Sequence, residues 1–309
     1  MTLARASGRR RVLGHPPPGL TGLLAVVGSN IIWGSSVVFF KQLDHLDIYT
    51  TAAHRVLWTA VLGVILLILM GRWWALATIL STPKLMKRLL VSALLIGSCW
   101  VIFVYAVKYD LILQISLSFY ITPLVSMLVG VFILSERLTR AQWAAMMLAG
   151  FGVLNLVVFL GILPWVSVLL AICFSCYCYI RKTTPVGATE GLCVEVLILV
   201  LGAILWLLWA STGEGQNVMG DDWWTITFLL MLGPITAIPL VMFAYGVQRV
   251  RMVTVGLMQY LEPTMLFLMA VVVYGEPFNE VYMLTFILIW MGVCVFSMDV
   301  WRLTLRKRG

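Results

Sequence analysis

The sequence predicts an all-α polytopic membrane protein with ten transmembrane helices, built as two five-helix repeats of inverted topology. Three observations predict this fold class. The 309-residue chain is 62% hydrophobic and only 11% charged, whereas soluble domains are roughly 25% charged. Its apolar residues gather in ten long runs, and parts of the second half repeat the first half at one constant offset. A soluble fold could not hide this much apolar surface, but a lipid bilayer can.

Each apolar run is long enough to cross the hydrocarbon core, which takes about 20 residues of helix. The runs are 20–40, 48–70, 89–107, 111–134, 141–161, 163–180, 190–210, 223–247, 253–274 and 281–300. The first run follows a basic tail, as in a signal peptide, but it exceeds the roughly 7–15 apolar residues typical of one. We therefore expect it to remain as the first helix, between a basic N-terminal tail at 1–19 and the later helices. A second basic tail is expected at 301–309.

Basic residues in the connecting segments predict the orientation, because cytoplasmic loops carry an excess of Lys and Arg. If the N-terminus is inside, the outer loops hold only Lys41 and Lys108. Almost all other basic residues then fall on inner segments, including Arg181 and Lys182. An even number of helices returns the C-terminus to the same side. We expect a multi-pass protein of the plasma (inner) membrane with both termini cytoplasmic.

The chain also repeats itself at an offset of 140 residues. This shift places Tyr105, Tyr120, Pro123 and Glu136 on Tyr245, Tyr260, Pro263 and Glu276. The repeats are expected at 20–161 and 163–300, each with five helices. Because five is odd, the two halves must cross the membrane in opposite directions. Inverted repeats are typical of secondary transporters, whose substrate sites lie near the midplane at the repeat interface.

Ionisable residues inside the spans are candidates for function, because charge is costly in lipid. Arg55 lies in the second helix beside His54, and Glu195 lies in the seventh. The two charges approach from opposite faces, so we do not expect a direct pair. They could lie at the two mouths of one cavity, or they could extend to the nearer interface.

The remaining intramembrane acid, Glu262, precedes Pro263 in the ninth helix. Proline removes a backbone donor and loosens a helix, so this carboxylate could serve proton or cation coupling. Alternatively, it is a neutral acid that hydrogen-bonds to a freed carbonyl. We predict Glu195 and Glu262 as the protonatable coupling residues. Pro123 predicts a matching break in the fourth helix, where Thr122 replaces the acid.

Aromatic and amide side chains in the spans are candidates for binding an aromatic or amphiphilic solute. These residues are Trp33, Trp100, Tyr105, Tyr120, Tyr245, Gln259 and Tyr260. With His54 and Arg55 they complete the predicted substrate-binding set, although packing between helices is the simpler account of each residue taken singly. A separate group of tryptophans at helix ends is expected to anchor the chain at the membrane interface. That group is Trp73, Trp74, Trp223, Trp224 and Trp301.

Several other function classes lack support in the sequence. No nucleophile–base pair or phosphate-binding loop is present, so we predict neither an enzyme nor an ATPase. Cys173, Cys176 and Cys178 are spaced like metal ligands, but no further ligand completes a site, so we expect no metal or cofactor. The net charge of +8 comes without a nucleic-acid recognition motif. The expected partners are the lipid bilayer and a small-molecule solute, with a homodimer left open.

Short motifs along nearly the whole membrane region resemble a known family. They are Ile32-Trp33-Gly34, His54-Arg55-Val56-Leu57-Trp58, Tyr120-Ile121-Thr122-Pro123-Leu124, Ser135-Glu136-Arg137, Gln142-Trp143, Gln259-Tyr260-Leu261-Glu262-Pro263-Thr264, Tyr274-Gly275-Glu276 and Met298-Asp299. On these residues the chain resembles the RarD proteins, a branch of the EamA-type drug/metabolite transporter superfamily. The resemblance implies inverted repeats around a central cavity, with the fifth and tenth helices peripheral. It also implies a plasma-membrane permease of a kind often linked to chloramphenicol sensitivity.

The chain departs from the family at several polar positions. A family acid is replaced by Gln114, a family Asn by Thr122, and a small residue by Glu262. Glu262 could therefore substitute for the acid missing at Gln114. We predict a secondary transporter that moves a small organic or amphiphilic solute by alternating access. The alternatives are a membrane-embedded enzyme and a non-transporting sensor or partner subunit.

Overall fold

The computed structural model describes residues 19–43, 45–109, 111–161, 164–212, 218–220, 222–273 and 280–306. Throughout these ranges the regular structure is helical, without strands, and ten helices are long and apolar enough to cross a membrane. These helices confirm the predicted all-α membrane fold and the number of spans. The predicted N-terminal tail up to residue 18, and Glu276 of the repeat, lie outside the described residues.

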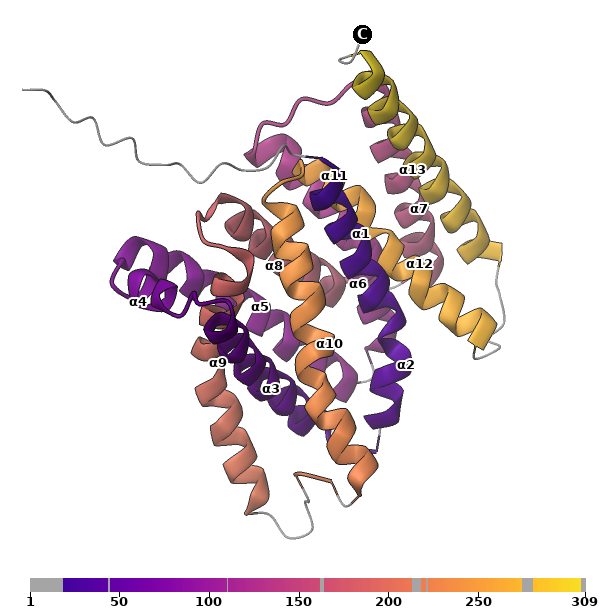
Figure 1. The fold of residues 1–309 in the computed structure, drawn as a ribbon. Helices are drawn as coiled ribbons and strands as arrows, with labels where there is room; N and C mark the ends of the chain where they lie inside the picture. Colours follow the sequence, from indigo (N-terminus) through magenta and orange to yellow (C-terminus); the bar gives the residue numbers. More distant parts are fainter. Residues whose placement is uncertain are drawn as a thin grey trace, which may run out of the picture.

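The spans follow one another with short connections (Figure 1). The first half contains α1 (Leu20–Ser35) with α2 (Val37–Phe40) and the 3₁₀ turn η1 (Lys41–Leu43), then α3 (Ile48–Leu69), α5 (Pro83–Lys108), α6 (Ile112–Leu128) with the π-helical η2 (Val129–Ile133), and α7 (Arg140–Leu160). The second half contains α8 (Trp165–Thr183), α9 (Ala188–Ser211), α10 (Trp223–Val247), α11 (Met252–Gln259) with α12 (Leu261–Leu268) and the π-helical η3 (Met269–Val273), and α13 (Glu280–Arg306).

Two boundaries differ from the sequence prediction. The third span begins at Pro83 rather than at residue 89, and a short helix, α4 (Trp74–Leu80), precedes it. The tenth span continues as helix to Arg306, into the predicted C-terminal tail. Hydropathy locates the lipid-exposed core of a helix, but a helix continues beyond that core wherever its backbone hydrogen bonds are satisfied.

Polar residues begin and end the helices where the sequence offers them. The Asp47 side chain accepts a hydrogen bond from the backbone N–H of Thr50 at 2.9 Å, which caps the start of α3. At the start of α7, Thr139 and Gln142 form a reciprocal capping box. Gly161 ends α7 in the left-handed conformation, with φ +60°, which glycine adopts without steric cost.

Helices from the two halves pack against each other throughout the bundle. α7 packs along α13 at one edge (Figure 1), while α3 packs along α9, α6 along α8 and α1 along α10. The α7–α13 contact is close, because a Cβ on Gly292 would lie 2.7 Å from the backbone oxygen of Ala145. Asn155 bonds to Thr285 at 3.1 Å across the same contact. Small residues and interhelical hydrogen bonds are what hold helices together in lipid.

Pro123 and Pro263, which correspond at the offset of 140 residues, have different effects. Pro263 lies just after the break between α11 and α12 at Tyr260, where its missing N–H leaves one helical bond unmade. The break predicted at Pro123 is wrong, because α6 runs through that residue from Ile112 to Leu128. In α6 the Thr122 hydroxyl bonds to the Ser118 carbonyl at 2.7 Å. Hydroxyl side chains of this kind satisfy backbone groups near an intrahelical proline.

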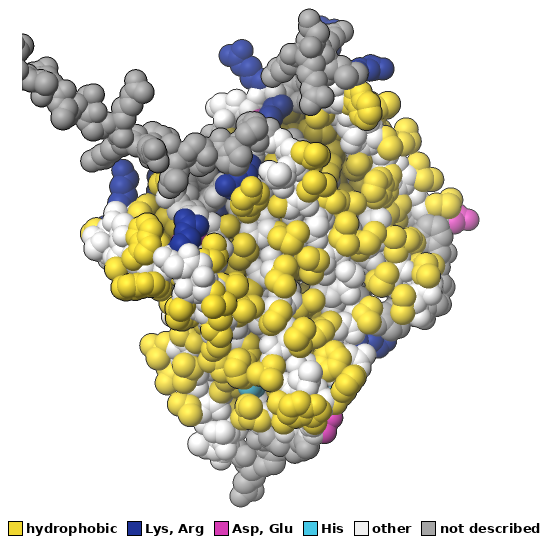
Figure 2. Space-filling model, viewed as in Figure 1, with side chains coloured by type: hydrophobic (Ala, Val, Ile, Leu, Met, Phe, Trp, Pro, Cys, Tyr) yellow, Lys and Arg dark blue, Asp and Glu magenta, His cyan; other side chains and the backbone are white. Residues whose placement is uncertain are grey.

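The surface has the polarity that a bilayer requires. Figure 2 shows hydrophobic side chains over most of the visible face, with Lys and Arg gathered toward the end where α13 finishes. We call this the basic end of the bundle. The start of α1 lies toward the same end (Figure 1).

We expect Gly292→Ala to destabilise the protein by about 1–3 kcal/mol, because the added methyl group must displace backbone at the α7–α13 contact. Thermal unfolding of the purified protein in detergent would measure the loss. Gly150→Ala is the matched control, since a Cβ there meets nothing within 4 Å. A melting temperature for Gly292→Ala at or above that of the control would contradict this account of the contact.

Candidate functional site

The centre of the bundle holds one arginine surrounded by aromatic rings. Arg55 extends from α3 and donates from Nε to the Thr236 hydroxyl on α10 at 3.0 Å. Its guanidinium lies 5.1 Å from the ring centre of Trp100 and 5.6 Å from that of Phe40. Cation–π contacts of this kind stabilise a guanidinium that has left water. Arg55 is thus fixed by α2, α5 and α10, and within the described part of the chain only its Nε–H group donates a hydrogen bond.

An acid from the other half of the chain faces this arginine. Glu262, on the first turn of α12, is close enough to Arg55 for the two charges to attract each other. The ion pairs among the described side chains do not include this one, so the attraction acts across an intervening distance. Both side chains lie deep in the bundle yet keep part of their surface accessible. The site therefore places an arginine and an acid near each other without closing them into a contact ion pair.

The helix break positions Glu262. Gln259 and Tyr260, at the end of α11, are buried, and the amide oxygen of Gln259 and the hydroxyl of Tyr260 have no hydrogen-bond partner among the described residues. Most buried polar groups in proteins are paired, so two unpaired groups next to the acid mark this turn as polar. Gly34 of α1 lies against the Glu262 backbone, where a Cβ would come within 2.7 Å of the carbonyl oxygen.

Aromatic side chains extend from the arginine toward the basic end. The Trp33 ring lies 5.2 Å from that of Phe243 and 6.1 Å from that of Phe174. Trp33 and Trp100 pack against the same buried core residues and are each partly accessible. The structure thus brings together Trp33, Arg55, Trp100 and Glu262 from the predicted set.

His54 is next to Arg55 in sequence but makes different contacts. Its Nδ1 accepts from the indole N–H of Trp58 at 3.2 Å, and its Nε2 lies 2.7 Å from the Val218 carbonyl. Because an indole N–H can only donate, the proton of a neutral His54 sits on Nε2 and is donated to Val218. Both ring nitrogens are therefore occupied, and His54 ties α3 to the loop before α10.

A second buried charge group joins Arg181 of α8 to Glu195 of α9, and Ser92 of α5 contributes a hydroxyl to it. Glu195 accepts a hydrogen bond from the Ser92 hydroxyl at 2.6 Å and forms an ion pair with Arg181 at 3.5 Å. Arg181 and Glu195 are each only 1% exposed. Arg181 also donates to the Ala188 carbonyl at 3.1 Å. Arg181 was predicted in the inner segment after a span ending at residue 180, whereas the structure places it in the last turn of α8, with its side chain turned inward to meet Glu195.

One glycine makes that inward turn feasible. The guanidinium of Arg181 occupies the space that a side chain on Gly191 would fill. Gly191 lies one helical turn before Glu195 on α9, so the arginine passes over the glycine to reach the acid.

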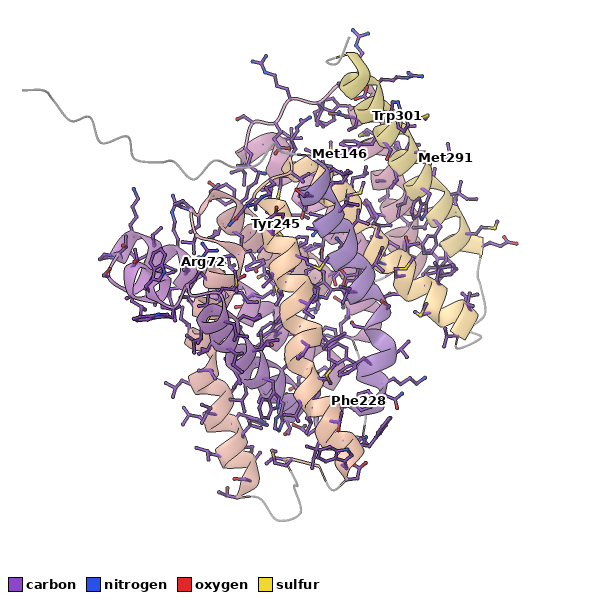
Figure 3. The ribbon with its side chains drawn as sticks, viewed as in Figure 1. Arg72, Met146, Phe228, Tyr245, Met291 and Trp301 are labelled. Atoms are coloured by element: carbon purple, nitrogen blue, oxygen red, sulfur yellow. The ribbon has the colours of Figure 1, made fainter. Side chains whose placement is uncertain are left out.

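The predicted tyrosines do not share one place. Tyr120 and Tyr260 are buried in the core formed by α6, α7, α11 and α13. Tyr105 is 42% exposed and contacts the rings of Tyr109 and Trp165. Tyr245 lies on the upper part of α10 in Figure 3, with the Arg249 guanidinium 3.5 Å from its ring centre. None of these contacts places a tyrosine ring against Arg55.

Sequence reasoning missed the residues that complete both groups. Thr236 and Ser92 are single hydroxyls in apolar helices, and such residues usually bond within their own helix. The inward position of Arg181 was not predicted, because an Arg-Lys pair at a helix end is typical of an inner loop. Thr236 lies between Pro234 and Pro239, which is the only pattern that could have drawn attention to it. Across the described residues no group of three or more His, Cys, Asp or Glu could hold a metal ion.

Comparison with known proteins adds a family and a fold. The EamA-like transporter family matches the chain twice, at residues 20–158 and 162–298. An uncharacterised transporter of Vibrio cholerae is 36% identical over 90% of this chain and 92% of its own length. Protein RarD of Escherichia coli is 35% identical over 90% of this chain and 94% of its own length. A chloramphenicol-sensitive protein RarD of Pseudomonas aeruginosa is 30% identical over 93% and 97%.

One solved crystal structure shares the fold with a TM-score of 0.70. It covers 90% of this chain and 98% of its own chain at 17% identity. This likeness concerns the arrangement of the helices alone.

We expect Arg181→Met to cost about 3–5 kcal/mol of stability, because it leaves the Glu195 charge buried without its partner. The double variant Arg181→Met/Glu195→Met should recover most of this loss, since apolar side chains can replace a buried pair at little cost. Denaturant or thermal unfolding in detergent would compare the two. Equal stability of the single and double variants would show that the pair does not balance charge.

Proposed function

The chain belongs to the EamA-like transporter family, and we propose that it is a secondary transporter that carries a small amphiphilic solute by alternating access. The observation that carries the proposal is the central site. Arg55 and Glu262 come from different halves of the chain, carry opposite charges and keep accessible surface deep in the bundle. Ionisable residues inside a membrane protein usually mark a solute or proton pathway.

The chemistry of the site supports an amphiphilic solute. Arg55 has unused N–H donors for an anionic or polar group. The rings of Trp33 and Trp100, which are partly accessible and pack against the same core residues, offer apolar surface. Glu262 lies near enough to exchange its interaction with Arg55 for a proton when a solute binds. The proposed link to chloramphenicol rests on the Pseudomonas aeruginosa relative, which is named a chloramphenicol-sensitive protein.

The proposed inverted repeat has structural support beyond the matching sequence. Both π-helical segments, Val129–Ile133 and Met269–Val273, end the fourth and ninth spans at the same offset of 140 residues. The family also matches the two halves separately. With five spans in each half, opposite insertion follows. Such repeats move against each other around a site at their interface.

Glu136 links the two halves at the basic end of the bundle. Glu136, just after η2, accepts hydrogen bonds from the N–H groups of Met252 and Val253 at 2.6 and 3.0 Å. These N–H groups begin α11, where a carboxylate is favoured by the helix dipole. Within the second half, Lys182 at the end of α8 donates to the carbonyls of Val247 and Val250, which fixes the chain before α11. We propose that the Glu136 contacts form the inner gate and must break for the site to open toward the basic end.

The placement in the cell follows from the charge distribution. Basic residues gather at the end that holds both the start of α1 and the end of α13. Cytoplasmic surfaces carry this excess, so we propose an inner-membrane protein with both termini in the cytoplasm.

We expect Arg55→Gln to lower solute uptake about tenfold or more, since a hydrogen bond to a charged group contributes about 1.5–3 kcal/mol. Glu262→Gln, and Glu195→Gln at the second predicted coupling position, should each reduce the response to a pH gradient. Counterflow uptake of a metabolite panel that includes chloramphenicol, into proteoliposomes with and without the gradient, would measure both effects.

Glu280→Gln is the control for the transport variants, because Glu280 is an exposed acid on the first turn of α13. It should transport like the unaltered protein. Unchanged uptake by Arg55→Gln together with an intact pH response in both coupling variants would overturn the assignment of these residues.

We expect Glu136→Gln to loosen the inner gate, because a neutral amide accepts weaker hydrogen bonds than a carboxylate. Backbone hydrogen exchange should then be faster over Met252–Gln259 than in the unaltered protein, while exchange in α3 stays the same. Mass spectrometry of the exchanged peptides would measure this. If exchange at the start of α11 did not change, Glu136 would not be holding the gate.

A further inference from the structure

The short helix α4 lies in the connection between the second and third spans. It lies between α3 and α5 and projects to one side of the bundle (Figure 1). Its inner face carries Leu76 and Ile79, which pack with Leu89 of α5 and Val194 of α9. The corresponding connection between α9 and α10 has no helix among its described residues. α4 is therefore a fixed part of the fold that inverted symmetry does not require.

The outward face of α4 has the composition of a membrane interface. Trp73 and Trp74 are 63% and 56% exposed, and Leu80 is 60% exposed. Exposed tryptophans next to a helix that lies outside the spans are typical of the level of the lipid headgroups. The apolar side chains give this face affinity for a bilayer but do not choose among lipids.

Positive charge surrounds the same face. Arg72 precedes α4, and Lys84, Lys87 and Arg88 follow it on the first turns of α5, all four exposed. No Asp or Glu occurs in the sequence from residue 48 to residue 109, so no neighbouring acid on these helices offsets the charge. Arg88 is held in place by a bond to the Thr183 carbonyl at 2.8 Å. We call Arg72, α4, Lys84, Lys87 and Arg88 the α4 platform.

Arg72 connects the platform to the interior. Its Nη2 lies 2.5 Å from Oε1 of Glu190, on the first turn of α9. Arg72 is 44% exposed whereas Glu190 is 3% exposed, so one guanidinium faces both the surface and a buried acid. Figure 3 shows Arg72 between α4 and α9. An arginine has five N–H donors, which is enough to hold Glu190 and a surface anion at once.

We propose that the α4 platform binds the headgroups of anionic phospholipids. The exposed tryptophans lie in the interfacial layer, and the four cations meet the phosphate groups. Clusters of Lys and Arg beside a transmembrane helix attract anionic lipids in this way. Arg72 carries the effect inward, because a headgroup that orders Arg72 also orders Glu190 and the first turn of α9. That turn leads directly to Gly191 and Glu195, so the lipid stabilises the buried charge group.

Lipid binding to the purified full-length protein tests the proposal, with phosphatidylglycerol as the anionic probe and phosphatidylcholine as the neutral one. Native mass spectrometry would give the affinities. Phosphatidylglycerol should bind more tightly and should slow hydrogen exchange over the first turns of α9. The variant Lys84→Gln/Lys87→Gln should weaken phosphatidylglycerol binding about 25-fold, or about fivefold for each cation. Its affinity for phosphatidylcholine should not change.

The matched control removes two exposed arginines elsewhere on the basic end. Arg140→Gln/Arg302→Gln loses the same charge from α7 and α13, and it should bind phosphatidylglycerol as the unaltered protein does. If both double variants lost the same affinity for phosphatidylglycerol, the binding would be a general attraction between positive charge and anionic lipid. That result would overturn the proposed site. Protection of α9 by inorganic phosphate alone would identify a free-anion site instead, which also overturns it. If phosphatidylglycerol did not slow hydrogen exchange over the first turns of α9, the role proposed for Arg72 would be wrong.

Discussion

The structure depends on one constraint, which is that lipid offers no hydrogen-bond partner. Every polar group inside the spans must therefore be satisfied by the chain itself. Helices satisfy the backbone, hydroxyls such as Thr122 serve the carbonyls near proline, and Arg181 meets Glu195 out of contact with water. Gln259 and Tyr260, beside Glu262, are among the described buried side chains with a polar atom that has no hydrogen-bond partner. Polar groups that the protein leaves incompletely paired are available to something else.

The two buried acids illustrate different uses of the same chemistry. Glu195 has an ion-pair partner and a hydroxyl donor in contact, and almost no exposed surface. Glu262 has its opposite charge at a distance and keeps accessible surface. A closed pair gives the bundle a fixed arrangement, whereas an open pair can take in a third charge. The proposed gate at Glu136 contacts neither acid. It would control access to the open Arg55–Glu262 site and leave the closed Arg181–Glu195 pair unchanged.

The sequence predicted those features that are determined by residues near one another in the chain. Run length identified the ten spans, because the thickness of the bilayer sets a minimum for each helix. The cost of charge in lipid identified Arg55 and Glu262 before their surroundings were known. It could not predict that Thr236 would hold Arg55, or that Arg181 would turn inward, because each depends on which helices become neighbours. α4 was missed because seven residues are too few for a span and the tryptophans before it suggested only an interface.

Gly191 has a consequence for how this protein can change. The space above it is filled by the Arg181 guanidinium, so hydrogen is the only substituent that lets the arginine reach Glu195. The volume of one residue thus determines the electrostatics of another. A lineage that gained even a methyl group at this point would inherit an isolated anion in its core, unless the acid were exchanged as well. Positions 181, 191 and 195 therefore form a single unit of variation, although no pair of them is adjacent in the chain.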